Sequence, residues 1–222
     1  MDGESWVILS IGSRWIERIE RVAEQKGFTL WFTGLSGSGK TALAQYLEPE
    51  LRRRGLKVER LDGDIVRQGL TRDLGFSKED RDKNIERVTF VAKLLTRNGV
   101  AVLCSFISPY IERRNQSREE IGNFVECYVE CSLDKLIERD VKGLYKKALA
   151  GEIPNFTGVS DPYEPPPNPE IAVNSGTQTL KESAQIILDR LVELGYVPAA
   201  DEVYTEEDEA AVEDRLRALG YI

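Results

Sequence analysis

A glycine-rich segment early in the chain has the residue types and the spacing to bind a nucleotide polyphosphate. Residues 34–41 read GLSGSGKT, which fits the pattern GxxxxGK[ST]. Glycines let backbone N–H groups surround the phosphates, and a helix that starts there adds its dipole. The lysine would reach the β- and γ-phosphates of ATP, and the threonine would ligate Mg²⁺. The residues of this predicted ATP site are Gly34, Leu35, Ser36, Gly37, Ser38, Gly39, Lys40 and Thr41.

The flanking sequence supports this interpretation of the glycine-rich segment. Residues 28–33 read as a short β-strand, and residues from Thr41 onward read as a helix. This strand–loop–helix context is the one that the pattern requires, and it argues against the alternative of a chance glycine-rich turn. We therefore predict that ATP is a co-substrate and that Lys40 acts in phosphoryl transfer.

Two aspartates, Asp62 and Asp64, follow the next predicted strand on either side of a glycine. Ligands of open α/β sheets bind at the carboxyl ends of strands, so one of these carboxylates could receive a proton from an attacking hydroxyl. Phosphoryl transfer has a loose transition state, so positioning by Asp64 and charge neutralisation by Mg²⁺ matter more than activation of the nucleophile. We predict that Asp64 and Thr41 hold the metal. Taken alone, a DGD sequence is also typical of a simple turn.

The composition excludes several other kinds of site. The 222 residues include no histidine, which excludes Ser-His-Asp and Cys-His catalysis and zinc sites with histidine ligands. Three cysteines, Cys104, Cys127 and Cys131, form no CxxC pair, so we expect buried thiols rather than a disulfide framework or structural zinc site. The net charge of −8 and the lack of a long basic stripe disfavour nucleic-acid binding.

Strands and helices alternate along the chain in the order typical of a parallel α/β sheet. One helix is expected to begin with a capping box formed by Ser77 and Asp80 and to end at Gly99. This pattern predicts an α/β fold: a P-loop kinase three-layer sandwich with a mostly parallel five-stranded sheet and a lid segment. The predicted strands are 28–33, 57–61, 100–107, 124–131 and 171–173, and the predicted helices include 15–26, 77–98, 133–140 and 179–194.

The chain divides into a central domain and two extensions. We expect an N-terminal helical extension over 1–27, a P-loop kinase domain over 28–198 and an acidic C-terminal tail over 199–222. Residues 143–169 read as a lid, because the segment from 151 to 169 holds six prolines and is too long and irregular for a simple connector. The extensions could mediate self-association or pack on the core.

The N-terminus lacks the features of a targeting segment. Asp2 and Glu4 stand where a signal peptide needs positive charge, and no apolar run approaches the length of about 18 residues that a membrane span needs. We therefore expect a cytoplasmic protein with no membrane association.

Six segments over residues 28–195 together resemble the adenylylsulfate kinase family. They read GLSGSGKT, LDGDIVRQGL, DLGFSKEDRDKNIERV, SFISPYIERR, ERDVKGLYKKALAGEIPNFTGVSDPYEPP and NPE, in the family's order. The resemblance implies transfer of the ATP γ-phosphate to the 3′-hydroxyl of adenosine 5′-phosphosulfate (APS). The products would be 3′-phosphoadenylyl sulfate (PAPS) and ADP, in sulfate assimilation. It also implies a homodimer and functional coupling to ATP sulfurylase.

The resemblance further assigns roles to residues that would contact the acceptor. Asp64 would face its ribose hydroxyl, and two aromatic rings, Phe76 and Phe156, would enclose its adenine. Taken alone, Phe76 is more typical of a core position, and Arg81 of a helical i,i+4 ion pair. Arg139 would contact ATP. The implied acceptor-binding residues are Asp64, Arg67, Phe76, Arg81, Asn84, Ile107, Ser108, Lys142, Leu144 and Phe156.

Ser108 has two interpretations. The family's serine at this position has been described as a phosphoserine intermediate, which would make Ser108 a catalytic residue beside Asp64 and Lys40. However, no histidine is present to activate it, and direct in-line transfer needs no covalent step. We therefore favour a positioning or hydrogen-bonding role.

Two other functions remain as alternatives to this kinase. A P-loop kinase for another hydroxyl acceptor, such as a sugar acid or a nucleoside, is the first. A sugar acceptor offers no purine to stack, so the two phenylalanines favour APS. The second is a catalytically silent nucleotide-binding module that regulates or scaffolds a sulfurylase, and the presence of Lys40, Thr41 and Asp64 argues against it.

Overall fold

The computed structural model describes residues 25–140, 142–199 and 217. The predicted helix over 15–26 lies outside these residues except for its last two positions, and neither of those two is helical. The N-terminal extension and the acidic tail likewise fall almost wholly outside the described residues. None of the described helices is long and apolar enough to cross a membrane.

The described residues form a five-stranded sheet in the order β2-β3-β1-β4-β5, and all four strand pairings are parallel. A mostly parallel sheet was expected, and the sheet is parallel throughout. Parallel strands are buried on both faces, and the central strand is buried along its whole length. The strands are β1 (Phe28–Thr33), β2 (Val58–Asp62), β3 (Ala101–Ser105), β4 (Phe124–Glu130) and β5 (Ile171–Asn174).

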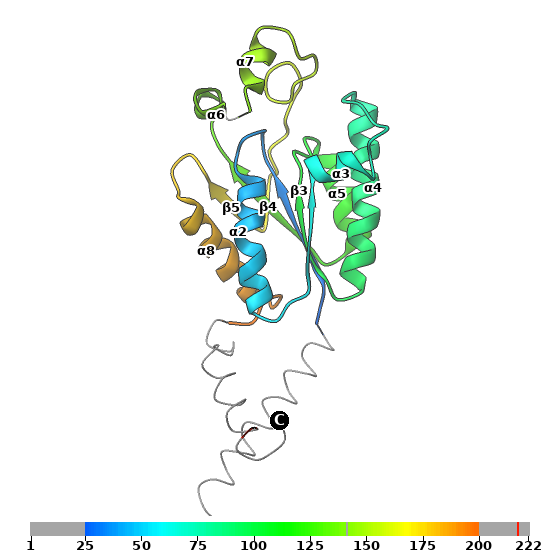
Figure 1. The fold of residues 1–222 in the computed structure, drawn as a ribbon, viewed down its shortest axis with the longest axis vertical. Helices are drawn as coiled ribbons and strands as arrows, with labels where there is room; N and C mark the ends of the chain where they lie inside the picture. The colour runs from blue at the N-terminus through cyan, green and yellow to red at the C-terminus, as the bar shows by residue number, and fades with distance from the viewer. Residues whose placement is uncertain (1–24, 141, 200–216, 218–222) are drawn as a thin grey trace, which may run out of the picture.

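Helices cover both faces of the sheet and complete the predicted three-layer sandwich. Figure 1 shows α2 and α8 on one face and α4 and α5 on the other. Side chains of β1 alternate between the two layers: Leu30 packs into the core under α2 and α8, and Trp31 packs into the core under α4. The bounds of these helices are α2 (Lys40–Arg53), α4 (Lys78–Arg97), α5 (Ile111–Ile121) and α8 (Leu180–Glu193).

The start of α4 differs in one detail from the predicted capping box. The Ser77 side chain accepts a hydrogen bond from the Asp80 backbone N–H, as expected. The carboxylate of Asp80, however, accepts from the Gly75 N–H at 3.0 Å instead of reaching back to Ser77. Glutamate or glutamine usually makes the return contact, and aspartate is one methylene shorter. Asn98 caps the other end, and Gly99 follows with a φ of 79°.

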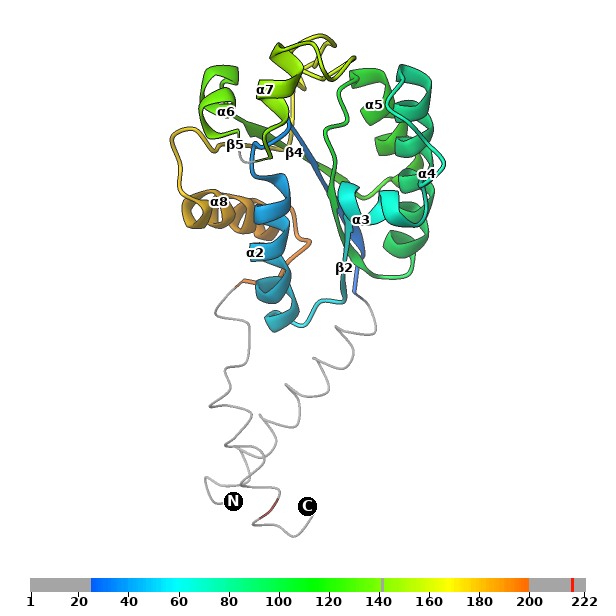
Figure 2. The same cartoon turned by 45° about the horizontal axis from the view of Figure 1, so that its top comes forward.

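Three short helices lie at the carboxyl edge of the sheet, where the site residues were expected (Figure 2). The DGD sequence, which could have been a simple turn, starts α3, with Asp62 as its N-cap. The N-cap carboxylate accepts from the Asp64 N–H at 3.0 Å. The other two helices belong to the segment above the glycine-rich loop. Their bounds are α3 (Gly63–Gln68), α6 (Leu133–Arg139) and α7 (Leu144–Leu149).

A buried arginine ties three segments together on the α5 side of the sheet. Arg114 is 2% exposed, and its Nε lies 2.6 Å from Oε1 of Glu126 on β4. Its Nη1 donates to the Ser108 carbonyl at 2.6 Å, and its Nη2 donates to the Glu164 carbonyl at 2.7 Å. The same guanidinium therefore holds the loop after β3 and the proline-rich end of the predicted lid.

Substitution of Arg114 by Met is expected to lower the free energy of unfolding by about 3 kcal/mol, because it leaves the Glu126 carboxylate buried with a weaker partner. Urea denaturation measures this change. The matched control is Arg190→Met on α8. Arg190 pairs with Glu193, which is exposed, so this substitution should lower the free energy of unfolding by less than about 0.5 kcal/mol. Equal effects of the two substitutions would contradict the structural role of the buried pair.

Candidate active site

The glycine-rich loop connects the end of β1 to the start of α2, as the sequence predicted. Gly37 and Gly39 have φ angles of 76° and 99°, which favour glycine. Gly34 is constrained by close approach as well: a Cβ there would lie 2.5 Å from the Val129 carbonyl oxygen of β4. The loop can therefore turn tightly beside the sheet only with glycine at these positions.

Lys40 lies folded back on its own loop. Its Nζ donates to the carbonyls of Gly34 at 2.8 Å and Leu35 at 2.7 Å. Burial and the nearby charge of Lys142 lower the pKa of Lys40 to about 7, although Asp62 acts in the opposite direction. A third, longer hydrogen bond runs from the same Nζ to the Ser38 Oγ at 3.5 Å.

The two aspartates after β2 occupy different environments. Asp62 is buried, and its Oδ2 accepts a hydrogen bond from the Thr41 hydroxyl at 2.6 Å. The Asp64 side chain is 74% exposed and forms an ion pair with Lys142 at 2.8 Å. Thr41 is thus brought together with Asp62, whereas Asp64 faces the segment that leads into α7.

Hard oxygen ligands are available where the glycine-rich loop meets β2. Mg²⁺ prefers one or two carboxylates together with substrate phosphates and waters. The hydroxyl of Thr41 and the carboxylate of Asp62 fit that preference. Among the described residues no group of three or more acidic, histidine or cysteine side chains could hold a metal by itself.

Two predicted acceptor residues lie together beyond α3. The guanidinium of Arg67 stacks 4.2 Å from the ring centroid of Phe76 and donates to the carbonyls of Leu74 and Gly75 at 3.1 and 3.2 Å. Desolvation, and then the charge of Arg81, lower the pKa of Arg67 from its ordinary value. Phe76 is 64% exposed, so it is a surface ring and not a core residue.

Arg81 on α4 is bound to the predicted lid rather than to another residue of its helix. It donates to the Thr157 hydroxyl at 3.0 Å, and it also bonds to the Asp161 carboxylate and the Asn155 carbonyl. The hydroxyl of Tyr110 donates to the same Asp161 carboxylate at 3.0 Å. Arg81 therefore bonds to residues of the predicted lid, and it does not form the helical i,i+4 ion pair.

Asn84, one turn further along α4, is buried, and its Oδ1 has no hydrogen-bond partner among the described residues. A buried amide oxygen without a partner is costly, and a hydroxyl of a bound ligand would satisfy it. This observation fits the predicted contact of Asn84 with the acceptor sugar.

Ser108 lies just beyond β3 in an unusual backbone conformation. Its φ is 45°, the residue is 2% exposed, and its Oγ accepts a hydrogen bond from the Trp31 indole at 2.9 Å. The carbonyl of the preceding residue, Ile107, accepts from the Thr33 hydroxyl at 2.8 Å. Both predicted residues therefore meet the end of β1 through well-defined contacts.

The remaining predicted residues belong to the segment above the loop. Arg139 ends α6 and donates to the Ser175 carbonyl at 2.8 Å, whereas Leu144 begins α7. The ring of Phe156 packs edge-on against Tyr145, with centroids 5.1 Å apart. No ring contact among the described residues joins Phe156 to Phe76, so the two rings are not stacked on each other.

Comparison with known proteins identifies the family. The family model described as "Adenylylsulphate kinase" matches residues 26–174. A Pseudomonas aeruginosa protein named "Probable adenylyl-sulfate kinase" is 68% identical over 167 residues, which are 75% of this chain and 78% of that protein. An adenylyl-sulfate kinase of Halothermothrix orenii is 58% identical over 179 residues, which are 81% of this chain and 97% of that protein. This chain belongs to the adenylylsulphate kinase family.

Two further relatives extend the comparison within the adenylylsulphate kinases. The Mycobacterium tuberculosis APS kinase, solved in complex with AMPPNP and APS, matches with a TM-score of 0.73 and 43% identity, over 75% of this chain and 98% of that one. A Sorangium cellulosum protein named "Probable bifunctional SAT/APS kinase 2" is 56% identical over 172 residues, which are 78% of this chain and 30% of that protein.

The predicted family, fold class and enzymatic activity are confirmed. The chain is an adenylyl-sulfate kinase, an ATP-using P-loop transferase of sulfate assimilation. The alternatives of a sugar-acid or nucleoside kinase and of a catalytically silent module are not supported.

Sequence reasoning missed several residues that position the site of this adenylylsulphate kinase. It named Asp62 without giving it a role, whereas the structure places Asp62, and not Asp64, against the Thr41 hydroxyl. The parallel register could have indicated Asp62, since this last residue of β2 pairs with Ser105 at the carboxyl edge of the sheet. Nothing in the sequence identified the partners of Trp31, Arg114 and Tyr145, because those partners are distant in the chain.

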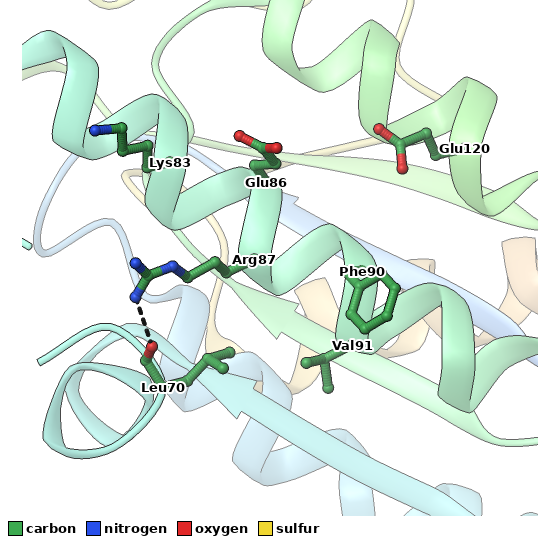
Figure 3. Close-up of a pocket in the computed structure, with 7 residues that line it drawn as sticks. All are labelled: Leu70, Lys83, Glu86, Arg87, Phe90, Val91 and Glu120. Atoms are coloured by element: carbon green, nitrogen blue, oxygen red, sulfur yellow. Dashed lines mark hydrogen bonds between the residues drawn. The ribbon is translucent and has the colours of Figure 1, made fainter.

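A groove of about 400 Å³ lies away from the nucleotide loop, along the outer face of α4 (Figure 3). Phe90 is 60% exposed there, and Arg87 donates to the Leu70 carbonyl at 3.0 Å. None of the predicted site residues lines it. The lining residues are Leu70, Lys83, Glu86, Arg87, Phe90, Val91 and Glu120.

The lowered pKa of Lys40 predicts that nucleotide binding takes up a proton. At pH 8 a lysine with a pKa of about 7 is mostly neutral in the free enzyme, and nearby phosphates would raise that pKa and protonate it. Titration calorimetry with MgADP in HEPES and in Tris measures the uptake, which should approach one proton at pH 8.

The same titration at pH 6 is the control, because Lys40 is already protonated there and the uptake should fall toward zero. A binding enthalpy at pH 8 that does not depend on the buffer would contradict a neutral Lys40 in the free enzyme.

Proposed function

We propose that ATP binds in the glycine-rich loop, that APS binds between α3, α4 and the predicted lid, and that the γ-phosphate passes directly to the 3′-hydroxyl of APS. The observation that carries this arrangement is the 2.6 Å hydrogen bond from Thr41 to Asp62. Asp62 is two residues from Asp64, so the phosphate cradle and the acceptor residues share one edge of the sheet.

Lys40, Thr41 and the backbone of the loop would bind the phosphates of ATP. To do so, Lys40 must give up its hydrogen bonds to the carbonyls of Gly34 and Leu35. Hydrogen bonds from lysine to charged phosphate oxygens are stronger than those to neutral carbonyls, which favours this change of partner. Arg139 lies at the end of α6 and would contact the rest of the nucleotide.

The Mg²⁺ ion would be held by Thr41 and Asp62, with Asp64 next to it. When bound, Mg²⁺ would neutralise charge on the β- and γ-phosphates. This assignment keeps the predicted role of Thr41 and divides the two aspartates: buried Asp62 supports the metal, whereas exposed Asp64 orients the acceptor hydroxyl and accepts its proton.

The acceptor would lie against the positively charged side of the site. Arg67 and Arg81 supply planar, multidentate donors for the phosphosulfate, which a local site can do despite the acidic net charge. Asn84 would bind the sugar through its unpartnered Oδ1. The other contacts would come from Phe76 and Phe156 with adenine, and from Ile107, Ser108, Lys142 and Leu144.

Ser108 would position the acceptor and not carry the phosphoryl group. Its Oγ is buried and already accepts a hydrogen bond from Trp31, and no described residue that could act as a general base bonds to it. Its positive φ and its carbonyl contact with Arg114 instead support a role in shaping the pocket wall.

Residues 28–198 would act as one domain with a lid over 143–169, in the cytoplasm, as a homodimer. The 56% identity to part of a protein named as a bifunctional SAT/APS kinase supports functional coupling to ATP sulfurylase. Such coupling would suit the chemistry, because a sulfurylase makes the acceptor of this reaction.

The acceptor assignment predicts ADP release that depends on APS. A coupled assay with ATP and Mg²⁺ should give turnover with APS and background rates with gluconate, adenosine or no acceptor, since only APS offers both a purine and a phosphosulfate. Mass spectrometry should find one added phosphate on the product. Turnover with gluconate or adenosine equal to that with APS would contradict the assignment.

Conservative variants should separate the two aspartates. Asp64→Asn should lower kcat by about 100-fold or more, with ATP affinity and Mg²⁺ dependence nearly unchanged, because the proton acceptor is lost. Asp62→Asn should instead raise the Mg²⁺ concentration for half-maximal rate by about 10-fold or more, because a metal ligand is lost.

Both variants are measured by steady-state kinetics across a Mg²⁺ titration. Each is the control for the other, since both replace a carboxylate by an amide of the same shape. Normal turnover of Asp64→Asn would remove Asp64 from the mechanism, and a reversed pattern would return the metal role to Asp64.

A further inference from the structure

The segment above the nucleotide loop contacts the loop through residues that the kinase chemistry does not use. The hydroxyl of Tyr145, on α7, donates to the Ser36 carbonyl at 2.8 Å. Gly158 packs so closely on the loop that a Cβ there would lie 2.7 Å from Cδ2 of Leu35. Tyr145 and Leu35 also belong to one small hydrophobic cluster with Leu136 and Phe156.

The Ser36 contact constrains the next peptide of the loop. In a trans peptide the C=O and the following N–H point in opposite directions. The carbonyl of Ser36 points to Tyr145, so the N–H of Gly37 points away from α7. Gly37 is a glycine with positive φ, and such a peptide would otherwise reorient easily.

The same lid segment is also tied to the acceptor side. Lys142, three residues before Tyr145, pairs with Asp64 at 2.8 Å. At its other end, Thr157 accepts a hydrogen bond from Arg81 at 3.0 Å. A single segment thus contacts the phosphate loop and the groups assigned to the acceptor.

The Tyr145 side chain is held firmly enough to link the position of the lid to the Ser36 carbonyl. It is 2% exposed, and burial raises the pKa of its hydroxyl to about 12, so the group remains a hydrogen-bond donor at neutral pH. Its α7 backbone is held as well, because the Asp140 carboxylate accepts from the N–H groups of Tyr145 and Lys146 at 3.0 and 2.9 Å.

We infer that Tyr145 is a positioning residue that couples the two substrate sites: its hydroxyl holds the Ser36–Gly37 peptide in the orientation that binds phosphate only when the lid is docked. Nucleotide binding then favours the docked lid, which presents Lys142, Leu144 and Phe156 to APS. By linkage, APS strengthens nucleotide binding by the same factor. This inference rests on the proposed acceptor site.

The test compares full-length wild type with Tyr145→Phe, which keeps the ring and its contact with Phe156. The dissociation constant of APS is measured by titration calorimetry with and without saturating AMPPNP. Wild type should bind APS more tightly with AMPPNP. Tyr145→Phe should lower this ratio of constants by about 2- to 10-fold, the value of one hydrogen bond.

Two further variants separate coupling from general stability. Tyr196→Phe alters a tyrosine that packs on Phe28 at the other end of β1, and it should keep the wild-type ratio. Gly158→Ala should lower the ratio without changing any hydroxyl, because its Cβ would press on Leu35 and alanine is strained at the φ of 90° found there, so the lid docks less well. Thermal unfolding of each variant is recorded in parallel.

The inference is overturned if Tyr145→Phe keeps the wild-type ratio, whatever its melting temperature, or if wild type itself has a ratio of one. Failure of wild type to bind APS with AMPPNP present would be a different result. It would overturn the proposed acceptor site and the coupling with it.

Discussion

A buried guanidinium is the constraint around which the α5 side of this kinase is organised. Arg114 cannot be desolvated without partners, and it finds them on three separate segments: Glu126 on β4, the Ser108 carbonyl and the Glu164 carbonyl. These three contacts hold the loop after β3 beside the proline-rich end of the predicted lid. Glu126 contributes to a second pair, with Arg118 at 3.4 Å, so the charge balance extends along α5.

The active site then follows from where parallel strands end. The glycine-rich loop follows β1, Asp62 ends β2 and Ser108 lies just after β3, and these three strands are neighbours in the sheet. The two aspartates differ in exposure, because Asp62 is the buried N-cap residue of α3 and Asp64 lies on the exposed first turn of that helix. Burial thus gives different surroundings and different partners to two carboxylates that are only two residues apart.

The sequence predicted a structural feature correctly wherever the interactions that form it are between residues close together in the chain. Apolar runs identified the strands, Ser77 identified the start of α4, and GLSGSGKT identified a loop whose backbone only glycine adopts easily. The full capping box was wrong because its second half depends on side-chain reach, and Asp80 bonds to Gly75 instead. The resemblance to the family supplied the predicted acceptor residues, which spacing alone could not have identified as a set.

The sequence by itself therefore determined the order of the five strands and of the longer helices and the phosphate-binding loop, since each depends on residues that are close together in the chain, and its lack of histidine excluded histidine chemistry. Only the tertiary structure decided which aspartate meets Thr41, what occupies Arg81 and which residues join the lid to the loop. Those contacts link residues 21, 80 and 109 positions apart. Their partners are selected by burial and by the pairing of buried polar groups, and neither is encoded in local spacing.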